Sequence, residues 1–153
     1  MQFSELLIIK PLLKAIDEEG FSIPTPIQEE AIPSLLKGRD ILGSAQTGTG
    51  KTAAFAIPIL QHLSETKQGK KSTPKALILS PTRELASQIY ANFRSYGKYL
   101  PLRSVVIYGG VSQGPQTSAL KKGADVLIAT PGRLLDLIQQ GFVKLGGITH
   151  FVL

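Results

Sequence analysis

One stretch of the sequence combines the residue types that bind a phosphate chain. It is the run Ala45-Gln46-Thr47-Gly48-Thr49-Gly50-Lys51-Thr52. Glycines at positions 48 and 50 let backbone N–H groups converge on an anion. Lys51 can reach the β- and γ-phosphates, and the Thr52 hydroxyl can bind Mg²⁺. The general pattern begins with glycine, but Ala45 still leaves room for the turn. The run predicts a site for a nucleoside triphosphate with its Mg²⁺, at which Lys51 and Thr52 act on the phosphates.

The hydrophobic pattern around this run alternates between helices and short strands. Capping, proline and periodicity signals predict helices at 11–19, 25–38, 51–63, 82–96, 113–122 and 134–140. Short apolar runs predict strands at 40–43, 75–80, 104–108, 125–129 and 148–153. This alternation indicates right-handed βαβ units, so we expect an α/β fold with a mostly parallel sheet and helices on both faces.

Four loops follow the predicted strands. They are 45–52, Pro81-Thr82-Arg83-Glu84, Gly109-Gly110 and Thr130-Pro131-Gly132-Arg133. Ligands of open α/β sheets bind outside the carboxyl ends of the strands. The loops therefore predict a nucleotide on one loop and an extended, negatively charged molecule on the others.

Composition and charge limit the kinds of molecule that we expect this chain to bind. The chain has 153 residues, which suits one domain, and it has no cysteine, which excludes disulfides and thiolate metal sites. The net charge of +6 is uneven: residues 1–40 carry four basic and seven acidic side chains (−3), and residues 41–153 carry thirteen and four (+9). This split favours an anionic partner for the later part. No apolar run is long enough for a membrane span and no secretory signal is visible, so we expect a cytoplasmic protein.

These motifs, together with Gly20-Phe21-Ser22-Ile23-Pro24-Thr25-Pro26-Ile27-Gln28, occur in the order and spacing of DEAD-box RNA helicases. The resemblance covers nearly the whole chain from Phe3 onward, and the compact first segment is most similar to bacterial members. It implies the amino-terminal RecA-like P-loop domain of an ATP-dependent RNA helicase. Residues 1–38 would form the Q-motif region at the adenine, and residues 39–153 a partial RecA-like domain.

The resemblance assigns the nucleotide contacts. Gln28 matches the glutamine that reads the adenine edge, Phe21 the aromatic that packs on the base, and Phe3 the upstream aromatic that supports it. An amide both donates and accepts, as adenine requires. Gln28 also completes a capping box with Thr25, and the two roles are compatible.

The resemblance assigns RNA-backbone contacts to the three later loops. The matching positions are Pro81, Thr82, Arg83, Gly109, Gly110, Thr130, Pro131, Gly132 and Arg133. Contacts to phosphate and sugar carry no base information, so binding without sequence preference is implied. Each loop also has an ordinary structural reading, since the prolines suit the first turn of a helix and Glu84 suits a helix start.

The family pattern continues with Asp-Glu-Ala-Asp after a strand like 148–153, and these acids lie outside the sequence. They hold Mg²⁺ and position the attacking water, while a second RecA-like domain supplies arginine fingers. We therefore expect the 153-residue chain to bind adenine nucleotide without hydrolysing it. The RecA-like order also implies a further strand between 40–43 and 148–153. In its absence we expect either direct pairing of these two strands or self-association through the exposed sheet edge.

Two other readings stay open. One is a module that holds nucleotide or RNA phosphate and does no chemistry. The other is a different P-loop protein, such as a small-molecule kinase, which would explain the glycine-rich run but leave Gln28, Arg83 and Arg133 without a role.

Overall fold

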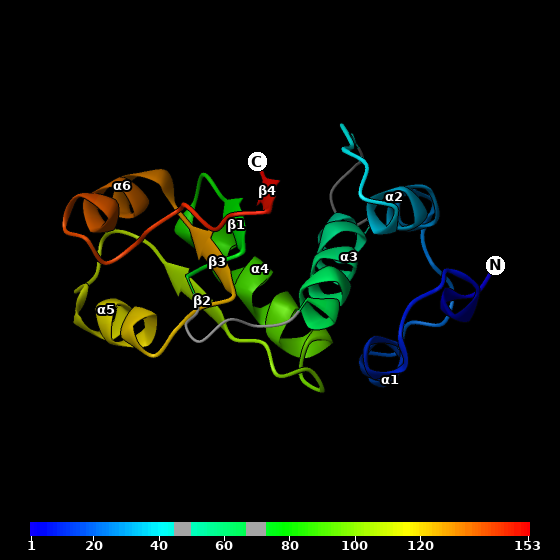
Figure 1. Cartoon of the computed structure of the whole chain (residues 1–153). Helices are drawn as coiled ribbons and strands as arrows, with labels where there is room; N and C mark the ends of the chain where they lie inside the picture. The colour runs from blue at the N-terminus through cyan, green and yellow to red at the C-terminus, as the bar shows by residue number, and fades with distance from the viewer. Residues whose placement is uncertain (45–49, 67–72) are drawn as a thin grey trace. The chain divides into compact units, whose positions relative to one another are not determined.

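The chain forms two compact units. The computed structural model describes residues 1–44, 50–66 and 73–153. The first unit comprises residues 1–66 and 92–101, and the second comprises residues 67–91 and 102–153 (Figure 1). The predicted boundary at residue 38 divides the adenine-binding region from the rest of the domain by their proposed roles, and it stays a prediction.

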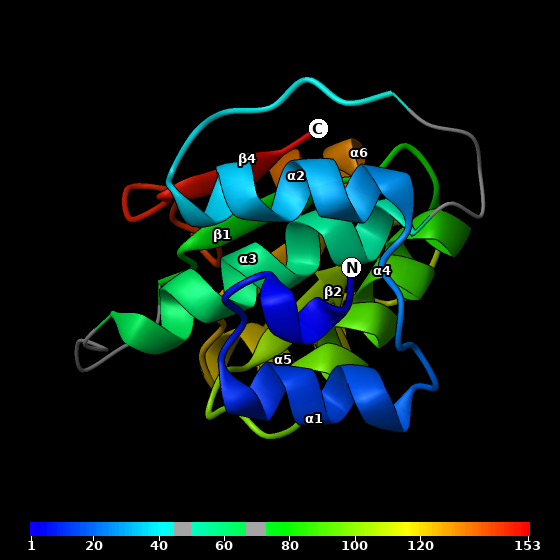
Figure 2. The same cartoon turned by 90° about the vertical axis from the view of Figure 1, so that its right-hand side faces the viewer.

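Helices dominate the first unit. A 3-10 turn, η1 (Phe3–Glu5), precedes α1 (Lys10–Glu18), α2 (Pro26–Leu36) and α3 (Lys51–Glu65), and α2 lies along α3 (Figure 2). The helices predicted at 11–19, 25–38 and 51–63 are confirmed, and η1 was not predicted. The capping box also forms, because the Thr25 hydroxyl accepts from the Gln28 N–H and the Gln28 side chain accepts from the Thr25 N–H. These two bonds fix where α2 begins.

A buried glutamine fastens the amino-terminal turn to α3. Gln61 is 7% exposed, and its Oε1 accepts from the Ile9 N–H at 3.0 Å while its Nε2 donates to the Leu7 carbonyl at 3.1 Å. Leu7 has a φ of +64°, the one positive φ outside glycine among the described residues, and its side chain is 84% exposed. The left-handed conformation is sterically unfavourable for leucine. The amide clamp therefore holds a strained turn.

A polar cluster fastens α1 to the residues that follow α4 (Arg83–Tyr96). The Tyr99 hydroxyl donates to the Glu18 carboxylate, and the Lys98 ammonium lies 2.9 Å from the same group. The Lys14 ammonium sits 4.4 Å from the centre of the Tyr99 ring. The hydrogen bond from Tyr99 and then that from Lys98 lower the pKa of Glu18. This contribution to stability is present above the ordinary carboxyl pKa and is lost as the pH falls through the lowered one.

The second unit is built on a parallel sheet. Its strands are β1 (Ala76–Leu79), β2 (Ser104–Ile107), β3 (Val126–Ala129) and β4 (His150–Val152), in the order β2-β3-β1-β4. Every pairing is parallel, and the ends of β1 and β2 both align with Ala129. The connecting helices are the first turns of α4, then α5 (Gly114–Lys121) and α6 (Pro131–Gln139). The α/β architecture and four of the five predicted strands are confirmed, and α6 begins three residues earlier than predicted, at a first-turn proline.

Alternation along the strands explains the two covered faces of this sheet. One face packs on α5 and α6 through a cluster that includes Leu77, Val105, Ile107, Leu127, Ala129, Leu134 and Leu137. The alternate residues Ile78, Val126 and Ile128 are also buried, and they point to the opposite face. Figure 1 shows α5 and α6 on one side of the strands and the start of α4 on the other. A parallel sheet shielded on both faces is the arrangement that such apolar strands favour.

The strand predicted at 40–43 does not form. Residues Asp40–Gly43 have no regular structure, and Leu42 is fully exposed. An isolated apolar tetrapeptide gains no ladder hydrogen bonds, so it becomes a strand only when a neighbouring strand pairs with it. The strands of the described chain pair only among themselves and leave β4 at an edge. The expected direct pairing of 40–43 with 148–153 is therefore wrong for the described residues.

The strained turn at Leu7 yields a stability prediction. Leu7→Gly should raise the free energy of unfolding by up to about 1 kcal/mol, because glycine adopts a positive φ without the steric cost that leucine carries. Chemical denaturation measures the change. Leu42→Gly is the matched control, since Leu42 is as exposed and has no positive φ; there the same substitution should be neutral or slightly destabilising. Equal losses at the two positions would show that the turn is not strained.

Candidate functional site

The predicted phosphate-binding run leads into the start of α3. Its first five residues, 45–49, lie outside the described residues, and the rest can be placed. Gly50 precedes α3 with a φ of +83°, and no side chain caps the first turn. Lys51 is exposed and Thr52 is half-buried in that turn. The first N–H groups of a 15-residue helix, a lysine and a threonine therefore stand together where an anion can bind.

Gln28 is joined to this helix start. Its side chain is 6% exposed, and its Nε2 donates to the Gly50 carbonyl at 3.1 Å while its Oε1 accepts from the Thr25 N–H at 3.0 Å. A Cβ on residue 50 would lie 2.1 Å from the Gln28 Nε2. The positive φ favours glycine at position 50, and a Cβ there would displace the Gln28 amide. One amide consequently ties the start of α2 to the end of the phosphate-binding run.

The Gln28 amide keeps unused hydrogen-bonding capacity. An amide oxygen has two lone pairs and an amide nitrogen two hydrogens, and the observed bonds to Thr25 and Gly50 use one of each. The remaining acceptor and donor match the two groups on the edge of adenine. Phe21 is 51% exposed and can offer a ring face, whereas Phe3 is 5% exposed and is part of the core of the first unit.

In the second unit the three later loops meet at one edge. The loops begin after Leu79, Ile107 and Ala129, the last residues of β1, β2 and β3. Because the strands are parallel and in register there, their carboxyl ends coincide. The predicted gathering of these three loops follows from the ladder itself.

The first loop carries an exposed arginine beside an aromatic ring. Thr82 caps α4 by accepting from the Leu85 N–H at 3.2 Å, so its hydroxyl has a structural role. The Arg83 guanidinium lies 5.4 Å from the centre of the Tyr108 ring, within the range of a cation–π interaction. A Cβ on Gly110 would lie 3.6 Å from an Arg83 terminal nitrogen, so Arg83 runs beside the glycine pair.

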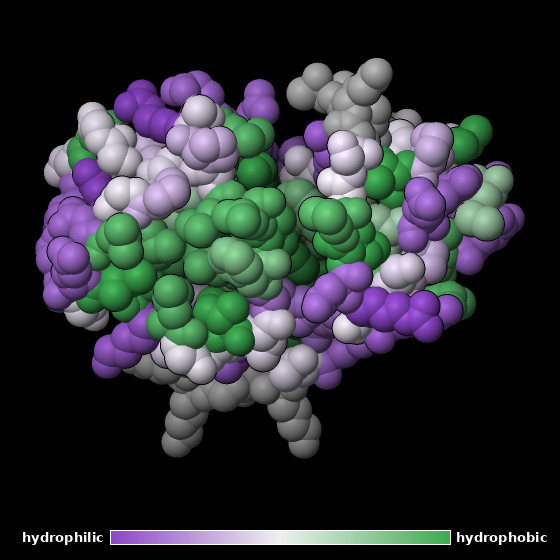
Figure 3. Space-filling model, turned by 90° about the horizontal axis from the view of Figure 1, so that it is seen from above, coloured by the Kyte–Doolittle hydropathy of each residue, from purple (hydrophilic) through white to green (hydrophobic). Residues whose placement is uncertain are grey.

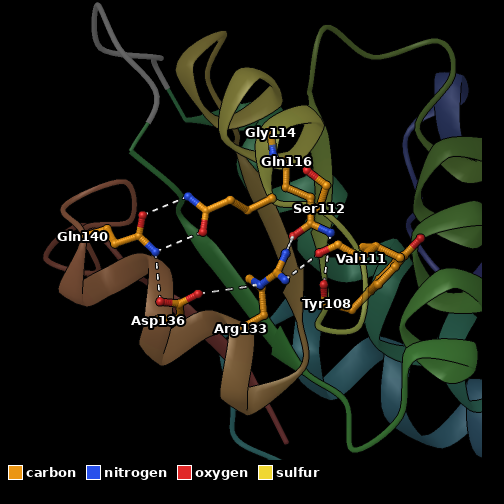
Figure 4. A network of polar contacts seen from close by, with 9 residues as sticks. Tyr108, Val111, Ser112, Gly114, Gln116, Arg133, Asp136 and Gln140 are labelled. Atoms are coloured by element: carbon orange, nitrogen blue, oxygen red, sulfur yellow. Dashed lines mark hydrogen bonds and ion pairs between the residues drawn. The ribbon is translucent and has the colours of Figure 1, made fainter.

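The second arginine is engaged within the protein (Figure 4). Arg133 donates from one terminal nitrogen to the Gln116 Oε1 at 2.8 Å and from the other to the Val111 carbonyl at 2.7 Å. Its Nε lies 3.9 Å from the Asp136 carboxylate, and its side chain is 12% exposed. The Gln116 Nε2 in turn donates to the Tyr108 carbonyl at 3.1 Å. Arg133 thus holds the Gly109-Gly110 loop against α5 and α6.

An amide pair extends this network. Gln113 and Gln140 exchange two hydrogen bonds, of 2.8 and 3.0 Å, and Gln140 also donates to Asp136 at 2.9 Å (Figure 4). The network therefore runs from Tyr108 through Arg133 to the far end of α6. Gln116, Tyr108, Gln113 and Gln140 were missed at the sequence level. Glutamines on amphipathic helices look like ordinary surface residues, and only the packing of α5 against α6 gives them partners.

Pro131 and Gly132 lie exposed in the first turn of α6, and Thr130 precedes it with extended backbone. Pro81 is exposed before α4. Pro131 thus has the first-turn role that the sequence allowed, whereas Pro81 lies one residue before the Thr82 cap and outside the helix. None of the described residues form a group of three or more histidine, cysteine or acidic side chains able to hold a metal ion. No described helix is both long and apolar enough to traverse a lipid bilayer.

The parallel sheet and the glycine-lysine-threonine start of α3 define an α/β protein of the RecA-like type. The sequence profile of the DEAD/DEAH box helicase family matches residues 25–153. The chain belongs to this family.

The names of three similar proteins agree with this family assignment. The chain is 49% identical over 138 residues to DEAD-box ATP-dependent RNA helicase 5 of Oryza sativa subsp. japonica, covering 88% of this chain and 27% of that protein. It is 48% identical over 134 residues to DEAD-box ATP-dependent RNA helicase RhpA of Helicobacter pylori (strain B128), with 88% and 26% covered. It is 46% identical over 143 residues to probable ATP-dependent RNA helicase ddx42 of Dictyostelium discoideum, with 93% and 14% covered. The chain thus spans between about a seventh and about a quarter of these relatives. They do not single out a bacterial type.

The Arg133 network yields a second prediction. Arg133→Lys should lower the free energy of unfolding by about 1–3 kcal/mol, because one ammonium group cannot reach Gln116 and Val111 together and leaves acceptors unpaired. Thermal or chemical unfolding measures it. Arg103→Lys is the control, since Arg103 is exposed and makes one long side-chain bond, of 3.4 Å, to the Ala119 carbonyl. An unchanged stability in Arg133→Lys would contradict the bracing role.

Proposed function

We propose that the chain is the ATP- and RNA-binding part of an ATP-dependent RNA helicase that locally unwinds RNA duplexes. The observation that carries this proposal is the direct link between Gln28 and Gly50, at 3.1 Å. It joins a residue type suited to reading adenine with the loop suited to holding phosphates. Family membership supports the reading, and nothing in the comparisons favours a small-molecule kinase.

ATP fits the described residues of the first unit. The spare donor and acceptor of Gln28 would recognise the adenine edge, and the half-exposed Phe21 ring would stack on the base. Lys51 and the uncapped start of α3 would bind the β- and γ-phosphates, and the Thr52 hydroxyl would bind the Mg²⁺ that accompanies them. The residues 45–49 complete this proposed site. Bound Mg²⁺ supplies charge neutralisation on the phosphate oxygens during phosphoryl transfer.

RNA fits the carboxyl edge of the sheet in the second unit. Arg83 would bind phosphate with its exposed guanidinium, and Gly109-Gly110 and Thr130 would offer backbone and hydroxyl groups to phosphate and sugar. Arg133 would share its remaining N–H groups while it braces the glycine loop. Such contacts read no bases, so the proposed binding has little sequence preference. A second RecA-like domain is the proposed partner that clamps the RNA when ATP is bound, and the cytoplasm is the proposed compartment.

Nucleotide titration tests the adenine site. Calorimetry with ATP, ADP and GTP should show a preference for the adenine nucleotides. Gln28→Ala should weaken ATP binding by roughly tenfold, as expected for loss of about one to two hydrogen bonds, and should leave GTP binding nearly unchanged. Equal ATP and GTP affinities in the wild-type chain would contradict the proposal.

Gly50→Ala tests the link itself. A Cβ there displaces the Gln28 amide and disturbs the start of α3. We expect this variant to lose affinity for ATP, ADP and GTP, and to lose more for ATP and ADP, because the displaced amide is also the proposed adenine contact. Glu29→Ala is the control, since Glu29 is exposed beside Gln28 and should leave all three affinities unchanged.

We also propose self-association through the free edge of β4. Three strongly exposed apolar residues, Leu135, Phe151 and Leu153, belong to α6 and the β4 segment. Figure 3 shows hydrophobic surface on the side where these elements lie in Figure 1. An unpaired strand edge beside apolar side chains can pair with a second copy of itself.

Sedimentation over a wide concentration range tests this edge. The chain should show concentration-dependent dimers, and Phe151→Lys should shift the equilibrium toward monomer by roughly tenfold or more, because charges on edge strands oppose pairing. The control is Ser118→Lys, on the exposed surface of α5. Phe142→Lys also lies away from the edge, but it cannot serve as the control because Phe142 packs on the core. A monomer at every concentration would contradict the proposal.

A further inference from the structure

The positive charge of the second unit is concentrated away from the RNA loops. Its described residues include seven basic and three acidic side chains, a net charge of +4. At the carboxyl edge of the sheet, Arg83 is accompanied by Glu84 and Arg133 by Asp136, so that edge is neutral. The excess therefore lies elsewhere in the unit.

The topology gathers that excess at the opposite edge. In a parallel sheet the residues that lead into each strand share one edge, and each connecting helix returns the chain to it. Five basic residues lie on these approaches to the strands, and we call them the amino-edge surface: Lys75, Arg103, Lys121, Lys122 and Lys144. Among the described residues at this edge the one acid is Asp125, which is 7% exposed, and its carboxylate accepts from the Arg103 backbone N–H at 2.8 Å.

Contacts within the protein hold several of these cations against neighbouring segments. An Arg103 terminal nitrogen donates to Ala119 near the end of α5, and the Lys121 ammonium lies 5.6 Å from the centre of the Phe142 ring. Lys144 is two residues beyond that ring. The same connection then reaches Gly147, where a Cβ would lie 3.3 Å from the Lys75 ammonium. These contacts place Arg103 beside α5, Lys121 beside Phe142 and Lys75 beside Gly147, so three of the five cations lie against segments that lead into strands.

These charges are not neutralised within the described protein. The ion pairs among its residues are Lys98–Glu18 and Arg133–Asp136, so none involves the amino-edge surface. Arg103, Lys121, Lys122 and Lys144 are exposed and Lys75 is half-buried. Several unpaired cations on one surface attract a polyanion in proportion to its charge density.

We propose that the amino-edge surface is a second binding surface for the RNA backbone, used by the stretch of RNA that extends beyond the carboxyl edge. The inference rests on the proposed RNA function, and it concerns different residues. Strands of three or four residues are only about 13 Å long, so one RNA molecule can reach both edges. Four of the five cations are lysines, which bind phosphate as point charges, so the contact is independent of sequence.

RNAs of two lengths distinguish binding at the carboxyl edge from binding at the amino-edge surface, because only a long RNA can reach both. Binding of single-stranded RNAs of roughly 6 and roughly 24 nucleotides, near the lower end of and above the usual range of single-strand site sizes, is measured by fluorescence anisotropy at several salt concentrations. The wild-type chain should bind the longer RNA more tightly and with a steeper salt dependence. Lys122→Gln/Lys144→Gln should abolish the advantage of the longer RNA and reduce the slope of log affinity against log salt by up to about 1.4.

A control variant removes the same charge from another place. Lys10→Gln/Lys37→Gln neutralises two exposed lysines of the first unit, and it should leave the slope unchanged. An equal reduction in both variants, or equal affinities of the wild-type chain for both RNAs, would overturn the amino-edge surface. Competition by polyglutamate at matched charge that exceeds competition by RNA would also overturn it, because the partner would then be an acidic protein.

Arg83→Ala distinguishes failure of this inference from failure of the proposed function. If this substitution leaves binding of the short RNA unchanged, the RNA grip at the carboxyl edge is wrong. The comparison of long and short RNA still decides the amino-edge surface in that case. Loss of short-RNA binding in Arg83→Ala, with no effect of Lys122→Gln/Lys144→Gln on the long RNA, would leave the proposed function intact and overturn the inference alone.

Discussion

The parallel hydrogen-bond ladder of β2-β3-β1-β4 is the constraint on which the second unit depends. Because its strands run in one direction and are in register at Ala129, every loop that follows a strand emerges at one edge. Every residue that leads into a strand lies at the other edge. The parallel pairing thus places the glycine, threonine and arginine residues of the loops at one edge of the sheet and a group of lysines at the other. Side-chain chemistry at either edge is a consequence of backbone geometry.

In both units, a planar side chain with several hydrogen-bonding groups joins a loop to a helix. The Gln28 amide joins α2 to Gly50, and the Arg133 guanidinium joins α6 to Gln116 and the Val111 carbonyl. Each side chain is largely withdrawn from water and keeps part of its capacity unused. A group already held by the protein loses little conformational freedom when a ligand arrives, which favours affinity. Bracing and binding are therefore compatible in one residue.

Much of this architecture could be predicted from local patterns. Apolar runs located four strands, and Thr25 with Gln28 located the start of α2 through a capping box that the structure contains. The failure at 40–43 has a physical cause, because a strand needs a partner and sequence does not say which partner is present. The glutamine network on α5 and α6 was equally invisible, since Gln113 and Gln140 acquire meaning only through contacts 27 residues apart in sequence. Roles assigned by family motifs to Phe3, Phe21 and the loop residues remain predictions.

The separation of charge in the second unit also makes it an electric dipole oriented along its strands. A polyanion that approaches through solution would exert a torque on such a dipole, and the lysine end would turn toward it before any contact forms. Arrival would then be ordered in time, with a loose, rotating encounter at the lysines preceding transfer to the neutral edge. Salt would slow the first stage far more than the second, because screening acts over about 8–10 Å at physiological strength and short contacts escape it.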